Sequence, residues 1–266
     1  VGAFEIVFRP TAAGARAAQV VINSDDAEKS PFVFGIVGVG LAADIQVGSQ
    51  GGGKGLFDWF GGRGSGQGNV GNGQTGASSE DGTDFGEVDV NGGSKEHTFW
   101  IWNKGSISLP LRGNPPVRID GPQASDFSVT RQPGMTNLPA GSLANFKLRF
   151  DPSDVGERTA TVHIANSDFN SSSFEFGVKG IGIVARMQVL GVGDHVVPDG
   201  QTQANAANGT TFGSLDVNTS ERVHPFTVHN LGQATLHLGP SSASGPQADA
   251  FRISMPTHGD VASGAS

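Results

Sequence analysis

Short runs of alternating apolar and polar residues, separated by turns rich in glycine and asparagine, extend along most of the chain. Near the start, Phe4, Ile6 and Phe8 alternate with small or charged residues, so the three would share one face of a half-buried strand. Comparable runs lie at 19–22, 31–39, 86–90, 97–102, 106–109, 127–130, 146–150, 160–164 and 173–178. No window shows a helical period of 3.6 residues. We therefore predict an all-β fold whose domains contain about seven or eight short strands, the pattern of a β-sandwich.

Parts of this pattern occur twice at a fixed spacing. Positions 142 residues apart match at Phe4, Phe8, Pro10, Gly14, Ile22, Phe32, Phe34, Gly35, Gly38 and Gly40, which repeat as Phe146, Phe150, Pro152, Gly156, Ile164, Phe174, Phe176, Gly177, Gly180 and Gly182. A second series recurs 127 residues further on, where Phe85, Phe99, Ile101, Asn103 and Gly105 match Phe212, Phe226, Val228, Asn230 and Gly232. Gly121-Pro122-Gln123-Ala124 and Phe127 return after 124 residues, as 245–248 and Phe251. Such spacing is the signature of a repeat array.

The repeats divide the chain into tandem immunoglobulin-like sandwiches, one complete and two partial. Residues 43–182 form the complete repeat, with a glycine-rich insertion at 49–80. Residues 1–42 correspond to the C-terminal part of a repeat, and residues 183–266 to the N-terminal part. The short junctions near Gly40 and Gly182 leave almost no linker between neighbouring repeats, so we expect adjacent domains to abut.

The two partial repeats complement each other. Continuing the numbering past Ser266 would place Phe4 at position 270, which is also 124 residues after Phe146. We therefore expect residues 183–266 of one copy and residues 1–42 of the next to form a single sandwich, either along a longer polypeptide or by strand complementation between subunits. The predicted core residues of this composite domain are Phe4, Ile6, Phe8, Val21, Phe32, Phe34, Phe212, Phe226, Val228 and Phe251.

Composition narrows the possible functions. The net charge is −8 and only 16% of the 266 residues are charged, which argues against electrostatic binding of nucleic acid. No apolar run approaches the length of a membrane span. The absence of cysteine excludes disulfides, thiol catalysis and cysteine metal sites.

Several motifs together carry a family resemblance. They are Asp81-Gly82-Thr83-Asp84-Phe85-Gly86, the run from Thr98 to Gly105, the segment from Gly121-Pro122 to Val129, and Phe150-Asp151-Pro152. With these motifs, the chain resembles the bacterial choice-of-anchor D repeat, within the ASH (Hydin-like) group of immunoglobulin-like domains. The resemblance implies a non-enzymatic spacer, stalk or scaffold, and it supplies no catalytic residue.

One strand carries an unusual aromatic surface. If Phe99 and Ile101 face the core, Trp100 and Trp102 face outward, where the next repeat has Thr227 and His229. An apolar patch of this kind is rarely left open. The insertion carries its own apolar cluster, consisting of Leu56, Phe57, Trp59 and Phe60. We expect this cluster to cover the tryptophans, within one chain or between neighbouring chains.

Candidate chemistry is sparse. Oxygen ligands in the turns at Asp25, Asp26 and Asp168 suit weak Ca²⁺ binding, although Asn, Asp and Ser are also ordinary turn residues. No grouping of nucleophile, histidine and acid lies in a motif that marks a hydrolase, so we expect no enzymatic activity and no cofactor.

The sequence therefore favours a structural protein of the cell surface or extracellular space, built as a filament or stalk in which copies or repeats follow head to tail. The alternative is an adhesin or carbohydrate-binding module of a larger surface protein, which would hold a glycan or another surface ligand.

Overall fold

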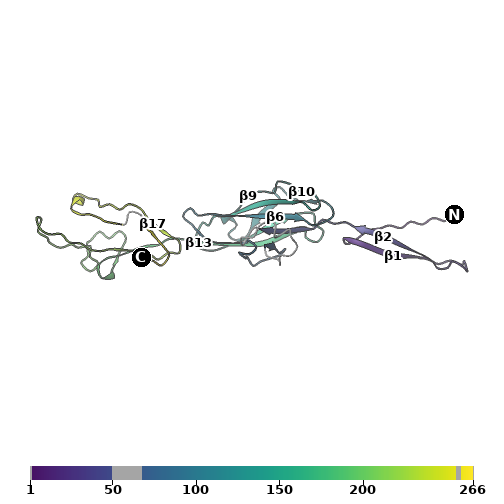
Figure 1. Ribbon diagram of the computed structural model, residues 1–266, viewed down its shortest axis with the longest axis horizontal. Helices are drawn as coiled ribbons and strands as arrows, with labels where there is room; N and C mark the ends of the chain where they lie inside the picture. The colour runs from purple at the N-terminus through teal and green to yellow at the C-terminus, as the bar shows by residue number, and fades with distance from the viewer. Residues whose placement is uncertain (1, 50–67, 256–258, 266) are drawn as a thin grey trace. The chain divides into compact units, whose positions relative to one another are not determined.

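The chain folds as an all-β protein. The computed structural model describes residues 2–49, 68–255 and 259–265 (Figure 1). The helices of this described part are short 3-10 segments at Ala124–Asp126 (η2), Val192–Asp194 (η3) and Ala248–Ala250 (η4), and none of them is long or apolar enough to cross a membrane. Contacts divide the chain into two compact units, one of Val1–Phe85, Glu96–Phe150 and Thr159–Lys179 and one of Gly86–Lys95, Asp151–Arg158 and Gly180–Ser266.

The complete repeat is a sandwich of two sheets. The five-stranded sheet has the order β4 (Asn69–Val70), β3 (Ile45–Ser49), β6 (Lys95–Asn103), β11 (Leu143–Phe150) and β9 (Phe127–Arg131). The four-stranded sheet has the order β5 (Asp84–Asp89), β13 (Ser173–Ile183), β12 (Gly156–Ala165) and β8 (Val117–Asp120). A small ladder pairs β7 (Leu109–Pro110) with β10 (Asn137–Leu138). The predicted all-β immunoglobulin-like fold is confirmed.

The core lies where the alternating side chains of both sheets meet. In β11 every second residue is buried, and β6 and β13 follow the same rule. Phe99 of β6 stacks on Phe146 of β11 at 5.4 Å between ring centroids and contacts Phe176 of β13 at 5.5 Å. Phe85 contacts Phe127 edge to face, with ring centroids 5.8 Å apart. Each buried phenylalanine contributes about 1.5–3 kcal/mol, so these rings are a main source of stability.

The N-terminal partial repeat contains a β-hairpin of β1 (Gly14–Ile22) and β2 (Phe32–Gly40), which form a two-stranded antiparallel sheet. Ile22 lies opposite Phe32 and Val20 opposite Phe34, so these four side chains share one face. Val21 lies opposite Val33 on the other face. The assignment of Val21 to one core with Phe32 and Phe34 was therefore wrong, because neighbouring residues of a strand point to opposite sides. Val20 and Ile22 lie on the face of Phe32 and Phe34.

The C-terminal partial repeat forms two small sheets. One has the order β15 (Val196–Val197), β14 (Met187–Leu190) and β16 (Thr227–Asn230), and the other pairs β17 (Leu236–Leu238) with β18 (Gly259–Val261). The pairing of β14 with β16 repeats that of β3 with β6, since Val189 lies opposite Val228 as Val47 lies opposite Ile101.

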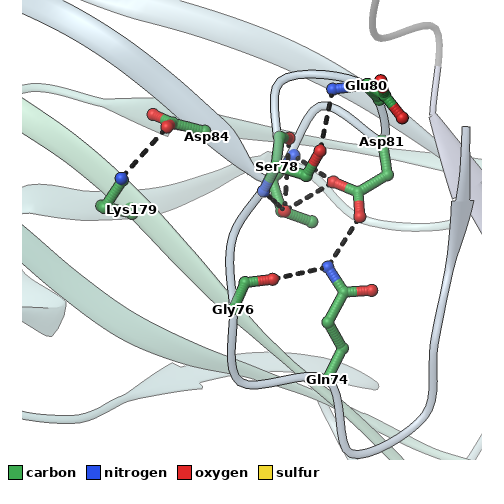
Figure 2. A network of polar contacts seen from close by, with 8 residues as sticks. Gln74, Gly76, Ser78, Glu80, Asp81, Asp84 and Lys179 are labelled. Atoms are coloured by element: carbon green, nitrogen blue, oxygen red, sulfur yellow. Dashed lines mark hydrogen bonds and ion pairs between the residues drawn. The ribbon is translucent and has the colours of Figure 1, made fainter.

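A polar network closes the loop that precedes β5 (Figure 2). The buried Asp81 carboxylate accepts hydrogen bonds from the Gln74 amide at 2.6 Å, and from the backbone N–H and the hydroxyl of Thr83 at 3.0 and 2.6 Å. Ser78 donates its backbone N–H to Thr83 Oγ1 at 2.8 Å. Lys179 of β13 forms an ion pair with Asp84 at 3.2 Å. The network fixes the chain direction at the start of β5.

The C-terminal partial repeat contains the same loop with an amide at its centre. Asn208, the counterpart of Asp81, donates to Gln201 Oε1 at 2.8 Å and accepts from Thr210 Oγ1 at 2.8 Å. In both repeats the phenylalanine that follows this loop stacks on a histidine. The ring centroids are 4.3 Å apart for Phe85 and His97 and 4.5 Å apart for Phe212 and His224. The sequence repeat is thus also a repeat of side-chain contacts.

Buried asparagines form a second repeated feature. Asn103 donates from Nδ2 to the carbonyls of Ile107 and Leu138 at 2.8 and 2.9 Å, and its Oδ1 accepts from the Gly105 N–H at 3.0 Å. Asn230 makes the equivalent bonds to Ala234, Val261 and Gly232 at 2.8, 2.9 and 2.9 Å. Each asparagine joins the end of its strand, β6 or β16, to the turn after it and to the β7–β10 or β17–β18 ladder.

Candidate interaction site

The predicted core residues of the two partial repeats lie at the surface, whereas their counterparts in the complete repeat are buried. Phe4 is 62% exposed but Phe146 is 0% exposed, and Phe251 is 54% exposed but Phe127 is 5% exposed. The same contrast holds for Phe8, Phe32 and Phe226 against Phe150, Phe174 and Phe99. Ile6 is also exposed, while Phe34, Phe212 and Val228 are half-buried. These side chains are apolar and open to solvent or half-buried, whereas their counterparts form the core of the complete repeat.

Backbone pairing shows the same contrast. In the complete repeat, β11 pairs with β9, with Arg149 opposite Ser128 and Phe150 opposite Phe127. The counterparts of these two strands, residues 2–8 and 251–255, are not strands. The strand expected at residues 3–9 is therefore not formed. The physical reason is that a strand needs a ladder partner, and the counterpart of β9 lies in the other partial repeat.

Two further segments also lack strand structure where their ladder partner would lie in the other partial repeat. Residues 211–216 correspond to β5 and residues 241–244 to β8, and neither is a strand. In the complete repeat these strands pair with β13 and β12, whose counterparts are β2 and β1 of the N-terminal hairpin. Strands form in the partial repeats where both partners lie in the same segment, as in the pairs β1–β2 and β14–β16.

The tryptophans lie on the outer face of the five-stranded sheet. Phe99, Ile101 and Asn103 are buried, whereas Trp100 and Trp102 between them are half-buried, as the alternation predicts. Gly48 lies opposite Trp100 and Gln46 opposite Trp102, and Lys104 Nζ lies 4.8 Å from the centroid of the Trp102 ring. Leu56, Phe57, Trp59 and Phe60 lie outside the described residues, so their contact with the tryptophans remains a prediction.

A charged group lies on the same outer face, near the start of β6. Glu96 binds Lys147 at 2.6 Å and accepts a hydrogen bond from Thr130 Oγ1 at 2.6 Å. The Lys147 and Thr130 hydrogen bonds hold the pKa of the Glu96 carboxyl below its ordinary value. The group joins three strands of the sheet, which is a structural role.

A histidine lies between two carboxylates on the outer face of the four-stranded sheet. His163 of β12 contacts Asp120 of β8 at 3.0 Å through Nε2 and Glu175 of β13 at 3.2 Å through Nδ1. Partial burial lowers the pKa of His163, but the bonds to Asp120 and Glu175 outweigh it and raise the pKa above 6.5. The bonds from Ser173 and His163 in turn lower the pKa of Glu175.

This cluster predicts a pH-dependent part of the stability. A histidine with a raised pKa in the folded state stabilises the fold fully at low pH and loses that contribution as the pH rises through the folded-state value. Urea titrations of the wild-type and His163→Gln proteins at about pH 5.5 and about pH 8.5 test this. The variant should be less stable at the lower pH, and the difference should shrink at the higher pH. His195→Gln, at an exposed site, serves as the control; a difference independent of pH would contradict the assignment.

The candidate cation ligands are engaged with the backbone. Asp168 is buried and accepts the N–H groups of Ile45 at 3.0 Å and Asn170 at 2.8 Å. Asp26 accepts the N–H groups of Glu28 and Lys29 in an exposed turn, and Asp25 is exposed in the same turn. Within residues 2–49, 68–255 and 259–265, no group of three or more His, Asp or Glu side chains is placed to hold a metal ion.

The sequence motifs do not indicate the loop contacts of Asp81, the strand contacts of Asn103 or the ion pairs of His163. Asn103 and His97 each recur at the 127-residue spacing, as Asn230 and His224, so the repeat itself was the available signal. His163 has no such signal, because its counterpart is Val21.

The family comparison agrees with this fold. Residues 78–180, less than half of the chain, match the family of HYDIN/CFA65/VesB-like Ig-like domains, so this part of the chain is similar to Hydin-like immunoglobulin-like domains. No curated protein matches the chain.

Among solved structures, a protein of unknown function from Porphyromonas gingivalis W83 is 14% identical with a TM-score of 0.34, and the match covers 66% of this chain and 69% of that one. The VesB protease of Vibrio cholerae is 16% identical with a TM-score of 0.28, covering 40% of this chain and 29% of that one. The PapD-like domain 7 of human CEP192 is 15% identical with a TM-score of 0.29, covering 39% and 81%.

Proposed function

We propose that this chain is a non-enzymatic structural segment of an extracellular or cell-surface array, in which residues 183–266 of one copy and residues 1–42 of the next complete one immunoglobulin-like sandwich. The observation that carries the proposal is the contrast between buried core residues of the complete repeat and exposed counterparts in both partial repeats. Open apolar grooves and unpaired strand edges favour association with a matching segment.

The complete repeat supplies the register of the composite domain. Residues 4–8 would take the place of β11, so Val7 would lie opposite Arg252 and Phe8 opposite Phe251, as Arg149 lies opposite Ser128 and Phe150 opposite Phe127. The hairpin would take the place of β12 and β13. The backbone hydrogen bonds of Gly264 and Ala265 with Asn230 repeat those of Gly141 and Ser142 with Asn103, at a spacing of 123 residues. If Ser266 were followed by Val1, the turn before Phe4 would therefore contain one residue more than the turn from Ser142 to Phe146. A β-bulge accommodates one extra residue.

Engineered disulfides test this register in a protein that has no cysteine of its own. In the Val7→Cys/Arg252→Cys variant, oxidation should produce a ladder of covalent multimers, because paired strand residues lie within the span of a disulfide. The Val7→Cys/Val155→Cys variant, with its second cysteine in an exposed loop, should give only background cross-linking.

A tandem fusion of two copies distinguishes the two routes to the array. In a longer polypeptide the composite sandwich lies at the junction, so the amides of the second copy's residues 4–8 should be protected from hydrogen exchange. Unprotected amides in the fusion, together with cross-links confined to single chains, would contradict the proposal.

The tryptophan face favours a second function, that of an adhesin or carbohydrate-binding module. Trp100 and Trp102 lie side by side in the alternation of β6, with Gly48 beside Trp100. Aromatic rings on the outer face of a sheet can stack on a sugar. A glycan array read with the wild type and with Trp100→Ala tests this, and binding that survives the substitution would exclude the face as the site.

A further inference from the structure

We propose that residues 198–203 of one copy bind along the open edge of β2 in the next copy, and that Gly35 is the residue that admits them. This segment, here named the docking loop, precedes residues 211–216, the counterpart of β5. The inference rests on the proposed array and adds a specific contact to it. The complete repeat contains the equivalent contact in full, which identifies both partners.

In the complete repeat, residues 71–76 lie along β13. Gln74 forms a parallel bridge with this strand. The Gly73 N–H donates to the Glu175 carbonyl at 2.8 Å, and the Gly177 N–H donates to the Gln74 carbonyl at 2.7 Å. Because these groups of β13 are engaged by the loop, they point away from β12, the neighbouring strand on the other side. The loop therefore occupies the edge of β13 that β5 continues.

A glycine allows the loop to pass this close. A Cβ added at Gly177 would lie 2.8 Å from the Thr75 carbonyl oxygen, which is too close for a side chain. Gly35 is the counterpart of Gly177, yet a Cβ added there would meet no atom within 4 Å. A glycine inside a strand weakens the strand and often marks the close approach of another backbone. Gly35 therefore fits a backbone that the separate chain does not bring to it.

The docking loop already has the conformation of residues 71–76. Gly73 and its counterpart Gly200 both have a positive φ, of 76° and 73°. The Gln74 N–H donates to the carbonyl three residues earlier at 3.1 Å, and the Gln201 N–H does the same at 3.2 Å. Each glutamine side-chain amide also donates to the carbonyl two residues later, at 2.9 and 2.8 Å. The loop thus needs little rearrangement to bind.

The groups that would bond to β2 are available. Within the described residues, neither the Gly200 N–H nor the Gln201 carbonyl has a hydrogen-bond partner. β2 pairs only with β1, so its other edge is open. By analogy with the complete repeat, the Gly200 N–H would donate to the Val33 carbonyl. The Gly35 N–H would donate to the Gln201 carbonyl.

A side chain adds a third bond. In the complete repeat, Asn72 Oδ1 accepts the N–H of Glu175 at 2.9 Å. The counterparts of these residues are Asp199 and Val33. A carboxylate oxygen accepts a backbone N–H at least as well as an amide oxygen does. The substitution therefore keeps the bonding pattern of the contact.

Hydrogen exchange in a tandem fusion with only the second copy isotope-labelled tests the contact. The Gly35 amide of that copy should exchange at least about tenfold more slowly than in the separate chain, because it gains the bond that Gly177 makes. The Gly200 amide of the same copy provides an internal control. Its partner would belong to a third copy, so in dilute solution it should exchange as fast as in the separate chain.

Substitutions test the role of the glycine. Gly35→Val in the second copy should abolish the protection of amide 35, because the new side chain would occupy the space of the loop backbone. Ala15→Val lies on the same side of the hairpin, at a position whose counterpart Glu157 is exposed, and should leave the protection unchanged. In the separate chain, Gly177→Val should likewise speed exchange of the Gly73 amide.

The outcomes separate this contact from the array. Protection of residues 4–8 in the second copy without protection of Gly35 would overturn the docking contact and leave the composite sandwich in place. Loss of protection at both would contradict the proposed function as well. Protection of amide 35 that survives Gly35→Val, or of the Gly73 amide that survives Gly177→Val, would overturn the assignment of the glycine.

Discussion

Phe146→Ala should lower the free energy of unfolding of the complete sandwich by about 3–5 kcal/mol, the usual effect of removing a buried phenylalanine ring. The ring is 0% exposed and stacks on Phe99, and no neighbouring backbone is free to collapse into the space because both sheets are already paired. Urea denaturation followed by tryptophan fluorescence would measure the change, since Trp100 and Trp102 belong to the same domain.

The matched substitution Phe4→Ala should behave differently. In the separate chain Phe4 is 62% exposed, so its removal should change stability by less than about 0.5 kcal/mol. In the assembled array it should weaken completion of the sandwich as Phe146→Ala weakens the intact domain, and the Val7→Cys/Arg252→Cys ladder should be lost. Equal effects of the two substitutions on the separate chain would contradict the open state of the N-terminal partial repeat, on which the proposed function depends.

Asn103→Ala should lower stability by about 1–3 kcal/mol. The substitution leaves the buried carbonyl of Leu138 without its side-chain partner, which costs about 1–3 kcal/mol, and it also removes the part-buried bonds to the Ile107 carbonyl and the Gly105 N–H. Asn103→Asp should also destabilise, because a carboxylate keeps the acceptor but cannot donate to the two carbonyls.

An exposed asparagine provides the control for this prediction. Asn91→Ala, in a solvent-facing turn, should change stability by about 0.5 kcal/mol or less. Hydrogen exchange should further show that Asn103→Ala exposes the β7–β10 ladder, because the Asn103 amide ties that ladder to β6. A protein that tolerates Asn103→Ala as well as Asn91→Ala would show that the repeated asparagine has no structural role.

Much of the fold could be predicted from the sequence because its signals are local. The alternation around Phe146 and Phe150 fixes which side chains point inward, and the 142- and 127-residue spacings fix which segments are equivalent. One core position at the hairpin was predicted wrongly: Val21 was placed in the core, although the same spacing makes its counterpart His163, which lies on the outer face.

The amino-acid sequence by itself determined the β-sandwich class and the inward positions of the core residues of the complete repeat, and it predicted the two partial repeats. Only the tertiary structure decided that Asp81 and Asn103 tie loops to strands, that His163 lies between Asp120 and Glu175, and that the hairpin is apolar on both faces. These features depend on which residues lie opposite each other across strands, and that register is set by pairing between segments far apart in the chain. For the same reason residues 2–8 and 251–255 have strand-like sequences but no strand: alternation creates the preference, and a ladder partner is needed to realise it.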